Sequence, residues 1–180
     1  MQSPIERAKH TLDRTAAYLA QRNHILASLL AFIACMLGFQ WLQLHLGAPM
    51  LDMMAAYERD QLTERMLIYG DEGRLLHARF TLWLDMVFPF VYGAFFAGLM
   101  HVAHRGAFVT GGVLAIVALM LVDWLENLQL LALLWEFPDL SDAQINAASA
   151  TTQGKTAAVQ FVLLWLLGGF LLRVVHRLRG

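Results

Sequence analysis

Residues 114–135 read LAIVALMLVDWLENLQLLALLW. A run of about 20 mainly apolar residues is long enough to cross the hydrocarbon core of a bilayer as a helix. This run also carries Asp123, Glu126 and Asn127 in its interior. Because an ionisable side chain at membrane depth is energetically costly, it is usually paired and often functional. The stretch therefore predicts a transmembrane helix and, within it, a site.

The composition extends the membrane assignment to the rest of the chain. Of 180 residues, 58% are hydrophobic and only 15% are charged, which is far more apolar than a soluble domain of this size requires. No basic patch with interleaved aromatic residues suggests a nucleic-acid partner. The single cysteine, Cys35, excludes an intrachain disulfide framework and a thiolate metal cluster.

Four apolar segments are long enough to span a bilayer, and polar segments separate them. The predicted spans are 24–46, 79–104, 109–135 and 156–175. The polar parts are an amphipathic segment at 1–23 and two outer loops at 47–78 and 136–155. We expect an all-α, single-domain, four-transmembrane-helix bundle, with an amphipathic helix on the outer surface between the first two spans.

Two finer features are expected in the outer loops. The run Gly70-Asp71-Glu72-Gly73 has the composition of a turn. Ser141 with Gln144 fits a capping box that opens a short helix, and the Ala/Ser/Thr-rich run up to Gly154 is expected to be a surface connection. The Met-rich stretch 50–54 is expected to contact the membrane or to form an adaptable lid.

Charge asymmetry predicts the orientation. Four spans put both termini on one side, and the segments on that side are mainly basic, whereas the other two loops carry an excess of acidic residues. By the positive-inside rule the termini are cytoplasmic, in a multi-pass protein of the cell inner membrane. The basic residues concerned are Arg7, Lys9, Arg14, Arg22, Arg105, Arg173, Arg177 and Arg179.

Polar residues of the predicted spans gather in their outer halves. Asp123, Glu126 and Asn127 share one face of the third span because they are spaced i, i+3 and i+4. Asp85 of the second span is expected at similar depth, and Pro89, four residues later, would free the Asp85 carbonyl group. We expect these side chains to line a chamber that opens to the outer face or the outer leaflet. The other polar residues expected near this chamber are Gln40, Tyr92 and Gln160. The inner halves are almost entirely apolar.

Three classes of function fit this pattern. In the first, Asp85, Asp123 and Glu126 act as catalytic or ligand-binding carboxylates, and the chamber binds an amphiphilic or cationic small molecule, with acid–base chemistry on a lipid as its reaction class. Three carboxylates close together in a low dielectric cannot all remain ionised without a bound cation. In the second class, the chain is an accessory subunit of a larger membrane complex. In the third, it is a proton- or cation-coupled transporter. Assembly into a homo-oligomer is also possible. A purely structural role, in which the polar cluster sets helix pairing, also remains open.

Other candidate residues carry weaker signals. His101 and His104 form an H-x-x-H pair, but no nearby acid or cysteine completes a metal site, so no metal is expected. Lys155 begins the fourth predicted span, where snorkelling to the interface would explain it. His45 and His77 are expected near the chamber mouth. No motif identifies a cofactor, and the bilayer is the one partner that the sequence establishes.

Overall fold

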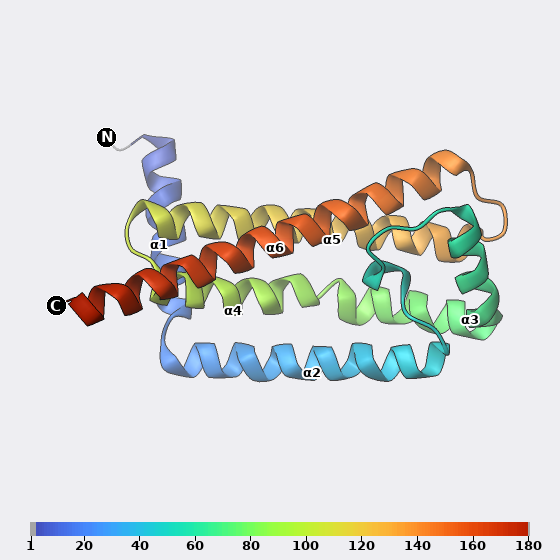
Figure 1. The fold of residues 1–180 in the computed structure, drawn as a ribbon, viewed down its shortest axis with the longest axis horizontal. Helices are drawn as coiled ribbons and strands as arrows, with labels where there is room; N and C mark the ends of the chain where they lie inside the picture. Colours follow the sequence, from blue (N-terminus) through green and yellow to red (C-terminus); the bar gives the residue numbers. More distant parts are fainter. Residues whose placement is uncertain (1–2, 180) are drawn as a thin grey trace. The chain divides into compact units, whose positions relative to one another are not determined.

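The computed structural model describes residues 3–179, and every regular element in that range is a helix (Figure 1). Four stretches are long and apolar enough to cross a membrane, which fits an integral membrane protein: Arg22–Leu46, Arg59–Ala103, Ala107–Glu136 and Asp142–Arg179. The elements are α1 (Pro4–Leu19), α2 (Arg22–Leu46), η1 (Leu51–Met53), α3 (Arg59–Phe80), η2 (Thr81–Asp85), α4 (Phe88–Ala103), α5 (Ala107–Glu136) and α6 (Asp142–Arg179).

The chain divides into two compact units, which are described separately. The first unit comprises Met1–Phe32, Phe90–Met120 and Ala158–Gly180. The second comprises Ile33–Pro89 and Leu121–Ala157. Long helices continue from one unit into the other, but each unit has buried apolar side chains of its own.

Helix α1 begins where the sequence supplies a complete start signal. The Ser3 hydroxyl accepts from the Glu6 backbone N–H at 3.2 Å, and the Glu6 carboxylate accepts from the Ser3 N–H at 2.8 Å. Pro4 occupies the first helical position, where a missing N–H costs nothing. The amphipathic segment predicted at 1–23 is thus helical from residue 4 to 19, and residues 1 and 2 lie outside the described residues.

Helix α3 contains one non-helical residue inside the turn that we predicted. Gly70 has φ 62° and ψ −177°, backbone angles that glycine adopts without a side-chain clash. Asp71, Glu72 and Gly73 are helical, so the predicted turn is reduced to a single residue. In Figure 1 the helix changes direction along its length, as the Gly70 backbone requires.

The predicted second span is interrupted before Pro89. Residues Thr81–Asp85 form one turn of π-helix, and α4 begins only at Phe88. Pro89 has no N–H to donate to the Asp85 carbonyl group four residues earlier, so the regular α-helical ladder cannot continue through this point. Single π-turns of this kind often mark functional positions.

The connection predicted at 136–155 is helical from Asp142 onward. The expected capping box is present, since the Ser141 hydroxyl accepts from the Gln144 N–H at 3.2 Å. However, α6 then continues without a break through Gly154 to Arg179. The Ala-rich composition favours a helix, and threonine hydroxyls such as Thr151 Oγ1 bond to the carbonyl group four residues earlier, so they do not stop it. The prediction of a surface connection there was wrong.

Small residues allow close approach inside the first unit. A methyl group at Gly98 of α4 would lie 2.6 Å from the Leu19 carbonyl oxygen at the end of α1. A methyl group at Gly93 would lie 2.8 Å from Met120 Sδ on α5. Gly93 and Gly98 therefore lie where other helices approach α4.

Replacing Gly98 tests this packing. We expect Gly98→Ala to destabilise the protein by about 1–3 kcal/mol, because the obstacle is rigid backbone and cannot rotate away. Gly154→Ala is the matched control, since nothing lies within 4 Å of the added methyl group and an alanine in a helix gains about 0.5–1 kcal/mol over glycine. Thermal unfolding in detergent measures both; equal melting temperatures for the two variants would contradict the close approach.

Candidate functional site: a buried acidic cluster with one lysine

Buried polar side chains concentrate in the second unit. In residues 3–179, every buried side chain that bears a carboxylate, an amide, an imidazole or an aliphatic hydroxyl group belongs to that unit. They are His77, Thr81, Asp85, Asp123, Glu126, Asn127, Ser149 and Thr152. Isolated polar groups are costly to bury, so such a concentration requires an internal network of partners.

Helix α5 supplies three of these groups from one face. Asp123, Glu126 and Asn127 are 4%, 2% and 0% exposed, respectively. Their i, i+3 and i+4 spacing turns them to the same side of the helix. The face predicted from the sequence is therefore a buried face of the second unit.

Lys155 of α6 is the cationic partner of this face. Its Nζ lies 3.4 Å from Asp123 Oδ1, and it forms a second, shorter ion pair with Glu126 Oε2. The lysine side chain is only 16% exposed. The snorkelling explanation was therefore wrong. Because residues 142–155 are helical, Lys155 falls on a buried face with Ser149 and Thr152, whereas a surface connection would have left it in solvent.

Asn127 fills the gap that Pro89 leaves in the helix ladder. Its Nδ2 donates to the Asp85 carbonyl oxygen at 3.1 Å, which is the oxygen that Pro89 cannot bond. This bond also fixes the orientation of the amide, because only the nitrogen can donate to a carbonyl group. The Asn127 Oδ1 atom is then buried without a hydrogen-bond donor among the described residues. The cluster thus presents an unused acceptor beside Asp85.

The segment between α2 and α3 adds a fourth carboxylate. Asp52 lies on η1, its side chain is 9% exposed, and its Oδ1 is 3.9 Å from His77 Nε2. The neighbouring Met50 and Leu51 are 2% and 0% exposed, so this part of the Met-rich stretch is internal and does not contact the membrane. Sequence reasoning missed Asp52 because a three-residue helix gives no periodic pattern.

Negative charge exceeds positive charge in this cluster. The four carboxylates are those of Asp52, Asp85, Asp123 and Glu126, and their charges interact with one another and with Lys155. Lys155 pairs with two of them, and in residues 3–179 no ion pair includes Asp85. A buried carboxylate without a counter-charge is unfavourable by several kcal/mol. A proton or a bound cation would offset this excess negative charge.

Tyr57 closes the network next to α6. Its backbone N–H donates to Ser149 Oγ at 3.0 Å, and the residue is 4% exposed. Burial raises the pKa of Tyr57 to about 12; Glu126 and Asp52 add to this effect, whereas a hydrogen bond with Thr152 and the charge of Lys155 oppose it. The tyrosine is therefore a neutral hydroxyl group at ordinary pH.

The remaining predicted site residues are Gln40, Tyr92 and Gln160. Gln40 belongs to the second unit, but its side chain is exposed on α2. Tyr92 is buried on α4 and Gln160 is exposed on α6, and both belong to the first unit, whereas the cluster belongs to the second. The structure therefore brings Asp85, Asn127 and their neighbours on α5 together, and it adds Lys155 and Asp52.

The chemistry available to the cluster is that of carboxylates and one ammonium group. Such groups can hold a cation, accept hydrogen bonds from a ligand, or exchange protons with it. Within the described range, no three His, Cys, Asp or Glu side chains are grouped so that they could hold a metal ion. His104 Nε2 donates to the Trp165 carbonyl oxygen at 2.9 Å, so this nitrogen of the H-x-x-H pair is already engaged.

Comparisons of the chain with models of known protein families, with curated proteins and with solved structures found no match.

Removing the lysine tests the ion pairs. We expect Lys155→Met to destabilise the protein by roughly 3–5 kcal/mol, because Asp123 and Glu126 would stay buried without a counter-charge. Adding Glu126→Gln to this variant should recover part of the loss. Lys9→Met, at an exposed position of α1, is the matched control. Denaturation in detergent measures all three variants; a Lys155→Met variant as stable as Lys9→Met would contradict the pairing.

The raised pKa of Tyr57 predicts a loss of stability at alkaline pH. An unfolded tyrosine ionises near pH 10, whereas folded Tyr57 keeps its proton until about pH 12. Between these values the unfolded chain binds fewer protons, so the free energy of unfolding falls as pH rises, by roughly 2 to 3 kcal/mol from this residue. Unfolding curves of the Tyr57→Phe variant between pH 9 and 12 should fall less steeply than those of the wild type. Parallel curves would show that Tyr57 is not buried in this way.

Proposed function

We propose that this chain is a four-span helical bundle of the cell inner membrane with cytoplasmic termini, forming a single membrane domain. The basic residues of the terminal segments and of the short connection at residues 104–106 support this orientation. Trp41, Trp83 and Trp135 are 46%, 81% and 61% exposed, as interfacial indole side chains would be. The first part of α3, before Gly70, is the amphipathic helix that we assign to the outer surface.

The function that we propose is the binding of an amphiphilic molecule through a cationic, hydrogen-bond-donating head group such as a primary ammonium. The observation that carries it is the Asn127 Oδ1 atom, which is fully buried, held in position by the bond to the Asp85 carbonyl group, and without a donor. An unmet acceptor in a buried network is unfavourable, so it favours a ligand that supplies an N–H group.

Charge supports the same class of ligand. Within residues 3–179, Lys155 is the one lysine or arginine ion-paired with this cluster of four carboxylates, so a second cation would offset the excess negative charge. A ligand that reaches the cluster from the bilayer must also carry an apolar body. Acid–base chemistry on such a ligand would use the same carboxylates.

The distribution of polar residues favours binding over transport. In the described part of the first unit, no buried side chain carries a charge or an amide group. A transport path needs polar or wettable groups along its length, whereas a binding site needs only one polar region.

Binding of simple alkyl probes tests the proposal. In detergent-solubilised protein, dodecylamine should bind more tightly than dodecyltrimethylammonium, which has no N–H group, and dodecanoate should not bind. Asp85→Asn should weaken dodecylamine binding by roughly ten- to a hundredfold, the value of one charge-assisted hydrogen bond.

Asp139→Asn serves as the control. Asp139 is exposed in the same unit, and its substitution removes the same charge. Asn127→Leu should abolish the preference for the primary amine over the quaternary one. The proposal fails if Asp85→Asn and Asp139→Asn bind dodecylamine equally well, or if dodecanoate binds as tightly as the amine.

A further inference from the structure

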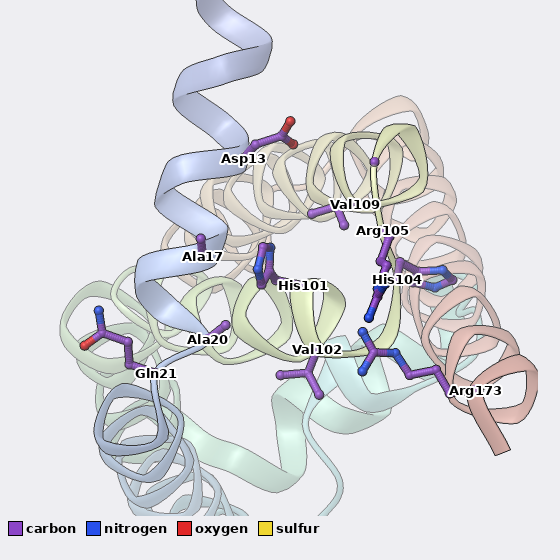
Figure 2. Close-up of a pocket in the computed structure, with 11 residues that line it drawn as sticks. Asp13, Ala17, Ala20, Gln21, His101, Val102, His104, Arg105, Val109 and Arg173 are labelled. Atoms are coloured by element: carbon purple, nitrogen blue, oxygen red, sulfur yellow. The ribbon is translucent and has the colours of Figure 1, made fainter. Parts of the chain in front are cut away.

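A second site-like feature lies in the first unit and shares no residue with the acidic cluster. A cavity of about 610 Å³ is formed by α1, the end of α4, the connection that follows it, α5 and the last part of α6. Figure 2 shows His101, His104, Arg105 and Arg173 around this cavity, with Gln21 at its edge in the connection between α1 and α2. The charged side chains that line it are two arginines and one aspartate, so basic groups outnumber acidic ones.

Two arginines of this cavity face one another. In Figure 2 the side chains of Arg105 and Arg173 reach toward the same region beside His104. Arg173 is held in place by a bond from its Nε to the Ala103 carbonyl oxygen at 3.2 Å, which leaves its terminal nitrogens for another partner. Like charges that point toward one another repel, and an anion between them would turn this repulsion into attraction.

Few acidic side chains lie near the two arginines to act as this anion. Among the described residues, Asp13 is the single acidic one that lines the cavity, and its Oδ1 already accepts from Thr110 Oγ1 at 2.8 Å. An adjoining cavity of about 560 Å³ shares His104, Arg105 and Arg173, adds His176 and Arg177, and has no acidic residue in its lining. The two cavities together form a basic region at one end of α4.

Apolar side chains border the same region. Phe108 and Leu172 line the second cavity and are 66% and 69% exposed. In a membrane protein, exposed apolar residues beside paired arginines match a lipid, since its acyl chains can cover the apolar surface while its phosphate meets the guanidinium groups.

We propose that these two adjoining cavities bind a phosphate group, with Arg105 and Arg173 as its bidentate partners and His101 and His104 beside it. The shared chemistry is that of a phosphate ester or phosphate ion. The apolar border assigns it to the head group of an anionic phospholipid, and free phosphate is the competing source.

The test compares lipids with the soluble ion in the full-length protein. Melting temperature in a neutral detergent is measured against added dioleoylphosphatidylglycerol, dioleoylphosphatidylcholine or inorganic phosphate. The anionic lipid should raise the melting temperature, and the half-saturating concentration should rise by roughly ten- to a hundredfold in the R105Q/R173Q variant. The R105K/R173K variant keeps the charge but loses the planar guanidinium group. Its half-saturating lipid concentration should lie between those of the wild type and R105Q/R173Q.

The matched control is R7Q/R179Q, which removes two charges from exposed positions of the same unit that line neither cavity. A response to phosphatidylglycerol alone that R105Q/R173Q weakens supports a lipid head group. A response to inorganic phosphate as well, weakened by the same variant, supports the phosphate site and identifies the soluble ion as its source. Equal responses to both lipids, no response to any probe, or equal weakening in R7Q/R179Q overturns the proposal. None of these results depends on the acidic cluster, because no cluster residue is changed.

Discussion

The ion pairs that Lys155 makes with Glu126 and Asp123 are the interaction on which the interior of the second unit depends. They link α5 to the first part of α6, and they allow two carboxylates to remain buried among apolar side chains. A buried ion pair adds little net stability over a well-packed apolar core, but the loss of one partner is severe. The arrangement therefore suits a site better than it suits a scaffold, since an apolar core would hold the helices equally well.

A second constraint comes from Pro89, which interrupts the helix after η2. The interruption frees the Asp85 carbonyl group, and Asn127 takes the place of the missing backbone donor. One side chain is thereby used to repair the backbone, and its Oδ1 atom is left facing the cluster without a donor. The irregular backbone and the unused acceptor thus arise from the same local event.

Much of the fold could be predicted because helices that can span a membrane are recognised by their length and apolar composition. Residues 114–135 predicted both a helix and its buried polar face, and Pro89 indicated the break beside Asp85.

The residues that the sequence did not predict were missed for specific reasons. The Ala/Ser/Thr-rich run before Lys155 resembles a loop in composition, yet packing makes it helical and turns Lys155 inward. Asp52 is placed by a three-residue helix that folds into the unit, which no local pattern reveals. Gln40 and Gln160 have exposed side chains, because sequence spacing predicts a position along the helix but not, for an isolated polar residue, the side that it faces.

We propose that a donor from outside the chain completes the cluster around Asp85. An experimental structure of the protein purified with its native lipids, at a resolution that shows ordered water, tests this most directly. The account predicts density for a donor-bearing group within hydrogen-bond distance of Asn127 Oδ1 and the Asp85 carboxylate, continuous with an elongated apolar body. An Asn127 Oδ1 atom and an Asp85 carboxylate that contact only side chains of this chain would contradict it.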